Sequence, residues 1–506
     1  MTATRRDGLG LALILAVAAV LRLPGLPGRG EWDDDQGDQL LTMLHWVRDG
    51  QIPDLGPMGS LGTAHHGVAY YWLLAPGAYL TDANPVAAVA TLAIVGMAGV
   101  AATWWLGRIV GGPLAGHLAG LLMAVSASAI TASTFVWNSN IVGPATALAV
   151  AAGWQAWRTR HARWWIFAAV GMALAMQGHL SSLLAAPPLI GMALADVARR
   201  PGGQRRHVLM PLLGAAAVVV ISYLPLLAHE LRHDFSEIRA IVDFVVSGRG
   251  RSLPTPAGSS LAALPVIAWR VLASPLSGFV LSAPLAGFAA LFTVSVAVAV
   301  AALGTSCIAR QYGRWSVATI VWAVAALSVI SPSLGIMTPG LPTDQYHAWL
   351  DPILLAAVGV ATAHLWSTAV TVGRFACVAI IASCLALALL AMPPLTSPGG
   401  GWPAAAAAAD RIRVHVGGQP VAITGVAKAG TSLAFPLQRA GANVVTPSSA
   451  DYLVVVCDPL FERAVGLPCG GPAETAAAHQ SGLSVARLVD RFANSPRLVV
   501  CVFARE

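Results

Sequence analysis

Residues 85–106 read PVAAVATLAIVGMAGVAATWWL and contain no charged side chain. About 20 consecutive apolar residues in an α-helix span the hydrocarbon core of a bilayer. Other apolar stretches of similar length recur along the chain, near 8–26, 112–135, 139–156, 163–180, 181–197, 208–228, 284–307, 315–332, 347–366 and 374–393. We therefore predict a polytopic α-helical membrane protein with about eleven transmembrane helices.

The overall composition agrees with this interpretation. The 506 residues are 56% hydrophobic and 10% charged, whereas roughly a quarter of the residues in a soluble domain are charged. So few charges would leave a soluble surface covered with apolar patches. The composition excludes a water-soluble enzyme and a disordered chain.

The net charge of +7 reflects membrane orientation. The arginines form short clusters between the apolar stretches, as in cytoplasmic loops, so we expect no nucleic-acid partner. With eleven crossings, one side of the membrane receives Arg5, Arg6, Arg108, Arg158, Arg160, Arg163, Arg199, Arg200, Arg205, Arg206, Arg310, Arg314 and Arg374. We predict that this side is the cytoplasm and that the protein lies in a bacterial plasma membrane.

This orientation divides the chain into two predicted domains. Residues 1–394 form a transmembrane domain with outer loops 27–84 and 229–283, and residues 395–506 form a soluble extracytoplasmic α/β domain. In the soluble domain the pattern predicts strands at Val421–Thr424, Tyr452–Val456 and Leu498–Phe503, and helices near 429–440 and 473–489. Cys457 can form a disulfide with Cys469, with Cys501 as the competing partner.

The first outer loop contains an acidic cluster. Gly30-Glu31-Trp32-Asp33-Asp34-Asp35-Gln36-Gly37-Asp38-Gln39 follows the first span directly and holds five carboxylates within eight residues. Adjacent carboxylates raise at least one pKa, which suits a general base or a cation site. Apolar spacing predicts an amphipathic surface helix over Gly37–Arg48. The alternative is a structural role, with Asp35 or Asp38 as the helix cap.

Further polar residues occur at the predicted outer ends of spans, where such residues indicate a site. Candidate substrate-binding residues are His65, His66, Tyr70, Asn138, Asn140, Gln177, His179, Gln345, Tyr346 and His347, with Arg239 and Arg270 from the long outer loop. Structural roles compete: Asn138 and Asn140 can cap a helix, and His179 can hold its own turn. A surface helix over Glu230–Val246 would bring its arginines to lipid headgroups.

These features resemble the GT-C class of polyprenyl-phosphate-sugar-dependent glycosyltransferases, and in particular family 39, with its protein mannosyltransferases and aminoarabinose transferases. The resemblance rests on the acidic cluster, a second surface helix opening with His65-His66, the turn Trp137-Asn138-Ser139-Asn140 and the C-terminal domain. It implies a sugar donor linked to polyprenyl phosphate and a lipid, glycan or protein acceptor.

The resemblance also implies roles for individual residues. An aspartate of the first outer loop would be the general base. The family usually has an Asp-Glu pair where this chain has Asp33-Asp34-Asp35-Gln36, so any of the three aspartates can be the base; we favour Asp34 or Asp35. His65 and His66 replace the family's Lys-Pro-Pro and would face the lipid phosphate. The acidic run has the oxygen ligands that Mg²⁺ or Ca²⁺ prefers, but the resemblance is to metal-independent members, so we expect no metal and no cofactor.

Two other functions compete with this interpretation. A transporter or flippase would show two related halves and charges near the centres of helices, whereas here the charges lie at span ends. A membrane scaffold presenting the C-terminal domain would leave the carboxylate cluster and the paired histidines without a role.

Overall fold

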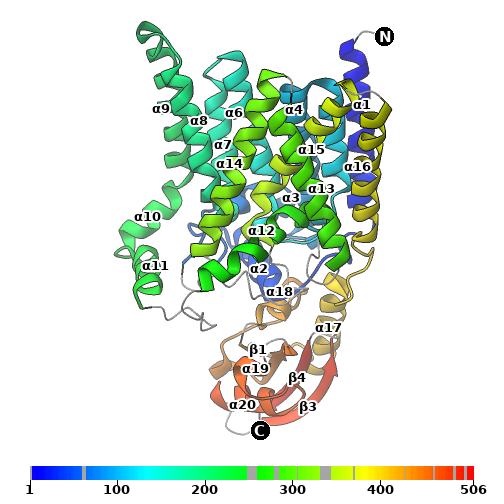
Figure 1. Ribbon diagram of the computed structural model, residues 1–506. Helices are drawn as coiled ribbons and strands as arrows, with labels where there is room; N and C mark the ends of the chain where they lie inside the picture. Colours follow the sequence, from blue (N-terminus) through cyan, green and yellow to red (C-terminus); the bar gives the residue numbers. More distant parts are fainter. Residues whose placement is uncertain are drawn as a thin grey trace.

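The computed structural model describes residues 3–59, 64–247, 259–277, 284–304, 306–330, 344–368, 371–427, 429–459, 462–481, 486–494 and 498–505. It contains a large helical bundle with a small mixed α/β unit at one end (Figure 1). We call this end of the bundle the domain-bearing end.

The bundle is built from the helices α1 (Ala3–Arg22), α2 (Asp34–Asp49), α3 (Ala69–Thr81), α4 (Pro85–Val125), α5 (Ala127–Thr131), α6 (Val142–Thr159), α7 (Trp164–Gly178), α8 (Ala186–Ala198), α9 (Arg206–Ser222), α10 (Leu224–Arg232), α11 (Ser236–Ser247), α12 (Ser259–Ser277), α13 (Pro284–Leu303), α14 (Cys307–Ile330), α15 (Asp351–Thr368) and α16 (Thr371–Leu390). Short 3₁₀ turns connect several of them, namely η1 (Asn138–Ile141), η2 (Leu180–Ala185), η3 (Gly202–Gln204), η5 (Asp344–Tyr346) and η6 (Ala348–Leu350).

Each of the eleven predicted spans falls on a helix, which confirms a polytopic helical fold. By length and apolar composition, seven helices among the described residues qualify as membrane spans, and Trp164–Gly178 and Leu261–Leu276 are shorter apolar helices. The count of eleven therefore stays a prediction.

The predicted spans 85–106 and 112–135 meet at a break inside α4. Gly112 adopts φ 86° and ψ −175°, and Pro113 follows it. A positive φ favours glycine, and proline removes a backbone donor, so this pair ends one helix and starts the next. Beyond the break, the second half of α4 runs beside the buried helix α15, whose apolar residues form the centre of the main core.

The end of α1 is held by a buried arginine. Arg22 donates hydrogen bonds to the carbonyl oxygens of Met123 at 3.0 Å and Ala124 at 2.7 Å, in the last turn of α4. The last carbonyl groups of a helix have no N–H donor within that helix. The guanidinium of Arg22 supplies the missing donors. A charge buried in this way fixes how α1 packs on α4.

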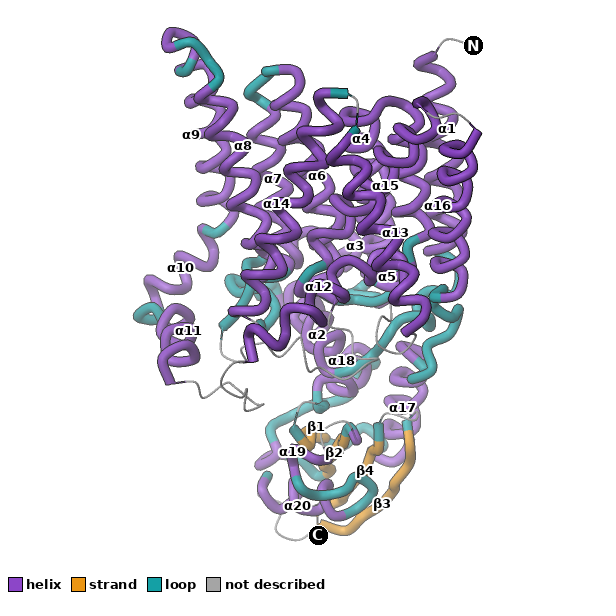
Figure 2. The backbone as a smooth tube through the Cα atoms, viewed as in Figure 1, coloured by secondary structure: helices purple, strands orange, loops and turns teal. Residues whose placement is uncertain are grey.

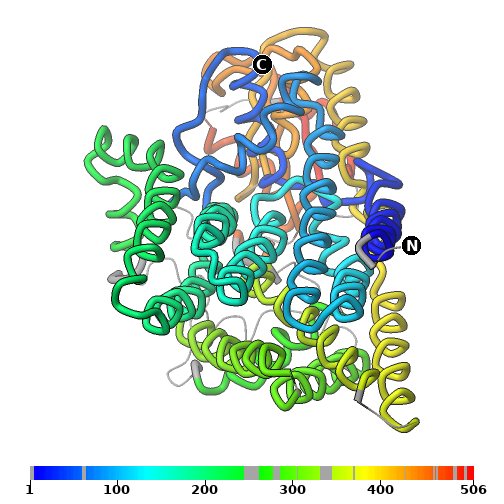
Figure 3. The backbone as a smooth tube through the Cα atoms, turned by 90° about the horizontal axis from the view of Figure 1, so that it is seen from above, coloured from blue at the N-terminus to red at the C-terminus, as the bar shows by residue number. Residues whose placement is uncertain are grey.

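The predicted outer loop 229–283 contains more regular structure than expected. The single surface helix predicted over Glu230–Val246 is instead two helices, α10 and α11, because Asp234 and Phe235 have positive φ values. The apolar helix α12 follows and packs on α13 and α14. Residues 248–258 and 278–283 of this loop lie outside the described residues. Helix α9 packs on α7, whereas α10 and α11 stand apart from the rest of the bundle (Figure 3).

The C-terminal unit is built around a four-stranded sheet (Figure 2). Its elements are α17 (Gly401–Val416), β1 (Val421–Val426), α18 (Thr431–Arg439), η7 (Pro447–Ser449), β2 (Tyr452–Cys457), α19 (Glu462–Val465), α20 (Pro472–Gln480), β3 (Ala486–Ala493) and β4 (Val499–Arg505). The strand order is β1-β2-β4-β3, with β1 parallel to β2 and the other pairs antiparallel.

One prediction for this unit is wrong. The helix predicted over 473–489 ends at Gln480, and Ala486–Ala493 forms the edge strand β3. The alanine-rich start of this segment favours a helix. Strand β3 is stabilised by pairing with β4, and this tertiary contact cannot be predicted from the local composition.

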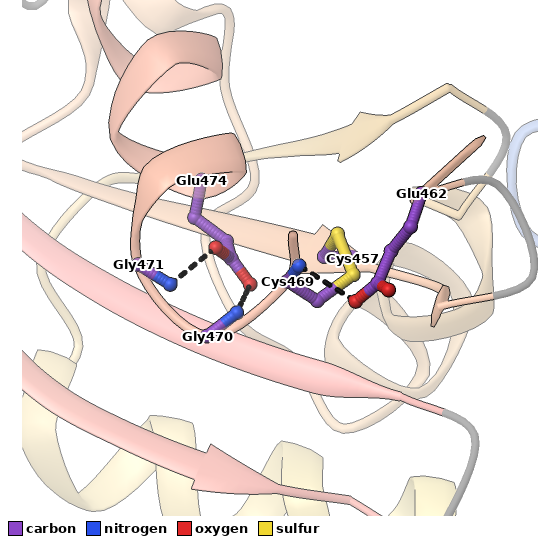
Figure 4. The surroundings of a disulfide bond; sticks show 6 residues. All are labelled: Cys457, Glu462, Cys469, Gly470, Gly471 and Glu474. Atoms are coloured by element: carbon purple, nitrogen blue, oxygen red, sulfur yellow. Dashed lines mark hydrogen bonds between the residues drawn. A yellow bond between two sulfur atoms is a disulfide. The ribbon is translucent and has the colours of Figure 1, made fainter. Parts of the chain in front are cut away.

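The disulfide between Cys457 and Cys469 is formed, with Cys501 free and buried (Figure 4). It closes a short loop that two carboxylates hold. Glu474 accepts hydrogen bonds from the backbone N–H groups of Gly470 and Gly471 at 2.8 and 2.7 Å, and Glu462 accepts one from Cys469 at 2.8 Å.

Candidate active site

The acidic cluster forms the first turn of α2. Asp33 is the N-cap, and its carboxylate accepts a hydrogen bond from the backbone N–H of Asp35 at 2.9 Å. The side chain of Gln36 returns a bond by accepting from the backbone N–H of Asp33 at 2.8 Å, which completes a capping box. The expectation that Asp35 or Asp38 caps this helix is wrong, because Asp33 already takes that position.

Asp34 contacts the C-terminal unit. Its Oδ1 accepts hydrogen bonds from the backbone N–H of Thr431 at 2.8 Å and from the Thr431 hydroxyl at 2.5 Å. The same hydroxyl also lies 2.7 Å from the main-chain carbonyl oxygen of Asp34. Thr431 is the first residue of α18, so the carboxylate lies at the positive end of that helix.

Asp35 is exposed, as is Asp38. Asp35 and Gln39 are four residues apart on α2, so their side chains lie on the same side of the helix. Of the three consecutive aspartates, Asp35 is therefore the one whose carboxylate is exposed and shares a helix side with the polar residues described next.

Gln39 connects α2 to the turn η1. Its side-chain amide donates to Asn138 Oδ1 at 3.2 Å, and Asn138 donates in turn to the carbonyl oxygen of Gly178 at 2.6 Å, at the end of α7. Asn140 donates to the carbonyl oxygen of Phe135 at 2.8 Å and holds its own turn. Asn138 thus joins the elements of the candidate site, whereas Asn140 has a local structural role.

A second group of polar residues surrounds the start of η2. The ring of His179 lies 5.7 Å from that of His66 and 5.0 Å from that of Tyr346, between ring centroids. His179 Nδ1 is 2.7 Å from the Ser181 hydroxyl, which lies 3.4 Å from the carbonyl oxygen of Gln345. The structure therefore brings together three predicted segments that are far apart in the sequence.

Gln177 bridges two elements near this group. Its Oε1 accepts from the backbone N–H of Ala69 at 2.9 Å, at the start of α3, and its side-chain amide donates to the carbonyl oxygen of Ser222 at 3.2 Å, at the end of α9. Gln177 is fully buried. Both hydrogen bonds are made to main-chain groups, so Gln177 holds the start of α3 and the end of α9 in place beside the site.

The paired histidines point to different partners. The backbone N–H of His65 donates to Glu237 Oε2 at 2.5 Å, and its ring Nδ1 lies 3.1 Å from the same oxygen. His66 is partly buried beside His179, and desolvation together with the neighbouring His65 lowers the pKa of His66 to about 4. At neutral pH His66 is uncharged, so it supplies hydrogen bonds but no positive charge.

The remaining predicted residues are spread more widely. Tyr70 is fully buried in a cluster with Leu40 and Leu44 of α2, so it packs in the core. Arg239 is exposed on α11. Arg270, on α12, and His347, just before α15, are both buried. Among the described residues, one close group of possible metal ligands exists, Cys457, Cys469 and Glu474, and its cysteines are bonded to each other.

The sequence analysis does not identify several residues that contact the candidate site. Their hydrogen-bond partners lie between 99 and 397 residues away along the chain; these residues are Gln39, Ser181, Glu237 and Thr431. The pattern in the sequence that points to Gln39 is its position one turn after Asp35 on a predicted helix. Thr431 opens a predicted helix, but nothing local indicates that Asp34 is its partner.

Comparisons with known proteins identify a family pattern in part of the sequence and solved structures with the same fold. Residues 65–229 match the family described as dolichyl-phosphate-mannose-protein mannosyltransferase. No curated protein matches the sequence. Among solved structures, ArnT from Cupriavidus metallidurans bound to undecaprenyl phosphate is 14% identical, with a TM-score of 0.60 and coverage of 99% of this chain and 98% of that one.

Two further structures show the same fold. ArnT from the same organism in its apo state is 16% identical, with a TM-score of 0.59 and coverage of 99% and 98%. The Archaeoglobus fulgidus oligosaccharyltransferase in complex with Zn and sulfate is 12% identical, with a TM-score of 0.50 and coverage of 98% of this chain and 73% of that one. The chain therefore has the fold of the GT-C class of membrane glycosyltransferases, and its residues 65–229 carry the sequence pattern of the protein mannosyltransferase group.

Proposed function

We propose that the protein transfers a sugar from a polyprenyl-phosphate donor to an acceptor hydroxyl or amine, with Asp35 as the general base. The observation that carries this proposal is the exposed carboxylate of Asp35 on the side of α2 where Gln39 contacts Asn138. The likeness to ArnT, a structure of which holds undecaprenyl phosphate, supports a donor of this chemical class.

The contacts of the three aspartates support different roles for them. Asp33 caps α2, and Asp34 binds the first residue of α18. Asp35 has the exposure that a base needs in order to meet an acceptor molecule. In the reaction, Asp35 accepts the proton of the acceptor hydroxyl or amine while that oxygen or nitrogen bonds to the anomeric carbon. The bond from this carbon to the phosphate oxygen breaks, and polyprenyl phosphate leaves as an anion.

Stabilising the departing phosphate requires positive charge or hydrogen-bond donors. The ring of His65 faces Glu237, and His66 is neutral. Arg270 remains as a buried guanidinium on α12, within the apolar bundle. An arginine at such a position in a membrane protein is a candidate for a functional site. We assign the phosphate to Arg270, with His66 and His179 as donors to the sugar or the phosphate, and Arg239 to lipid headgroups at the surface.

The same proposal sets the membrane orientation. Helix α2 and the C-terminal unit lie at the domain-bearing end (Figure 1). The start of α1 and the connections α6–α7 and α8–α9, whose sequences contain arginine clusters, lie at the other end. By the positive-inside rule the arginine end is cytoplasmic. The transfer then takes place at the extracytoplasmic face of a bacterial plasma membrane, with a lipid, glycan or protein of the cell envelope as the acceptor. Residues 1–394 form the catalytic domain in this proposal, and residues 395–506 an extracytoplasmic domain.

The test is transfer or release of sugar from radiolabelled polyprenyl-phosphate sugars by the full chain in nanodiscs. We expect Asp35→Asn to lower kcat by roughly 10²- to 10⁴-fold, the range of general-base catalysis. Asp33→Asn is the matched control, since asparagine caps a helix about as well as aspartate. Its activity is expected to stay close to that of the unmodified protein. An added EDTA arm is expected to leave activity unchanged.

The same assay separates the competing functions. If the unmodified protein consumes no lipid-linked sugar but moves it between leaflets, the protein is a flippase and this proposal is wrong. If Asp35→Asn is folded and fully active, the transferase proposal survives but its base is misassigned.

A further inference from the structure

The C-terminal unit is bonded directly to the helix that carries the proposed base. Trp32 Nε1 donates to the carbonyl oxygen of Ser432 at 2.8 Å, and Asp34 accepts from the backbone and the hydroxyl of Thr431. Near the other end of α2, His45 Nε2 lies 3.0 Å from Gln438 Oε1. The contact therefore runs along the whole length of α18.

Arg48 fixes the far end of this contact. It donates to the carbonyl oxygens of Gln438 and Arg439, each at 3.0 Å, and forms an ion pair with Asp82 at 2.6 Å. The side chains of Arg48 and Asp82 are 36% and 47% exposed, and ion pairs this accessible to water contribute little to stability. They orient α18, while the less exposed contacts lie at the end with the acidic cluster.

At the end of α2 that carries the acidic cluster, the backbones of α2 and α18 are in direct contact. A Cβ atom at Gly37 would collide with the carbonyl oxygen of Thr431, so the two backbones touch at a position where only glycine fits. Asp34 and Gly37 lie three residues apart on the same side of α2. Thr431 thus holds one face of the first turn through both its side chain and its backbone.

We infer that Thr431 is a positioning residue for the proposed transfer: by bonding to Asp34 it fixes the first turn of α2 and so the direction of the neighbouring Asp35 carboxylate. Both hydrogen bonds to Oδ1 of Asp34 come from Thr431, and the Thr431 hydroxyl also lies 2.7 Å from the main-chain oxygen of Asp34. The C-terminal unit is then part of the active site, although it supplies no group to the reaction. This inference rests on the proposed function.

Proximity catalysis explains why such a contact matters. A displacement of about 1 Å at a reacting group lowers a rate by roughly 10²-fold. Loosening the first turn of α2 would leave donor binding intact, because the donor contacts proposed above lie on other elements. The expected signature is therefore a lower kcat at an unchanged KM for the donor.

The experiment compares Thr431→Val, Thr431→Ser and Ser432→Ala in the full chain. Valine keeps the shape and the backbone N–H but removes the hydroxyl, whereas serine keeps the hydroxyl. Ser432→Ala is the matched control, because that hydroxyl donates to the carbonyl oxygen of Ala429 within the same unit. We expect Thr431→Val to lower kcat about tenfold, the scale of one lost hydrogen bond to a charged group. We expect Thr431→Ser and Ser432→Ala to keep kcat within about twofold of the unmodified protein.

The outcomes distinguish the inference from the proposed function. If the unmodified protein turns over donor and Thr431→Val keeps full kcat, the inference is wrong and the proposed function stands. A rise in donor KM, or a Thr431→Ser variant as slow as Thr431→Val, also overturns it, because packing rather than the hydroxyl would then be responsible.

A double-mutant cycle gives a readout that needs no activity. Thermal unfolding of Asp34→Ala, Thr431→Val and the double variant should show non-additive effects, since both single changes remove the same bond. Additive effects would contradict the contact itself. If no donor is turned over by the unmodified protein, the proposed function fails, and Thr431 has no catalytic role to support.

Discussion

At the scale of single residues, three neighbouring aspartates differ because their partners differ. Asp33 bonds within its own helix, Asp34 bonds to residue 431 and Asp35 is exposed. The identity of the residue therefore does not determine its role. The sequence predicts a carboxylate cluster, and the tertiary contacts then separate the carboxylates into a cap, an anchor and a proposed base.

His66 predicts a pH dependence of stability. Its pKa in the folded protein is about 4, below the ordinary value of 6.5, because burial disfavours the charged ring. Above pH 6.5 the residue is neutral in both states. As the pH falls towards 4, the unfolded chain binds the proton first, so the free energy of unfolding decreases, by at most about 3 kcal/mol.

Thermal unfolding in nanodiscs at pH 7 and pH 4.5 measures this effect. His66→Gln should flatten the decline, whereas His161→Gln, a change at an exposed histidine, should leave it as in the unmodified protein. Equal declines for His66→Gln and the unmodified protein would show that His66 is accessible to protons in the folded state.

At the scale of elements, α10 and α11 are held to the first loop by two histidine–carboxylate pairs. His65 contacts Glu237 of α11, and His229 Nδ1 of α10 lies 2.9 Å from Asp54 Oδ2. Glu230 bonds to the first backbone N–H groups of α11 at 2.9 and 3.1 Å. Helices that otherwise stand apart from the bundle are thereby fixed beside the candidate site.

Glu237→Ala should release α11 from this loop. The carboxylate is buried and accepts from both the backbone and the ring of His65, so its removal leaves these donors without that partner and costs about 1–3 kcal/mol locally. Hydrogen exchange over residues 236–247 should become faster, with no change in α18. The control is Arg232→Ala, at an exposed position of α10. Unchanged exchange in Glu237→Ala would mean that membrane contact, and not this pair, holds α11.

The elements also show how far the sequence predicts the structure. Apolar length predicts every helix from α13 to α16, because in a bilayer the backbone bonds within each helix. Polar residues in an apolar background likewise predict that the segments around His66, His179 and Tyr346 meet. The partners of Glu237 and Thr431 are not predictable, since one pairwise contact between distant segments leaves no periodic pattern. The edge strand β3 is not predictable for the same reason, because its pairing with β4 is a tertiary contact.

At the scale of the whole molecule, the orientation is testable through Cys307. Among the described free cysteines it is the exposed one, at the start of α14 beside the arginines of the predicted cytoplasmic end. An impermeant maleimide should label it only after cells are permeabilised. Val414→Cys, at a site 81% exposed in the C-terminal unit, should react in intact cells. Labelling of Cys307 in intact cells would reverse the proposed orientation.

The bond between Asp34 and Thr431 joins residues 397 positions apart. During synthesis the segment with Asp34 leaves the ribosome early, and α18 follows only after all the predicted spans. Under the proposed orientation, the nascent chain would carry its acidic cluster to the donor side long before the partner helix arrives. A protein interrupted before its last hundred residues would meet the lipid-linked sugar with an unfinished site. The first turn of α2 thus acquires its Thr431 contact only after every predicted span has been synthesised.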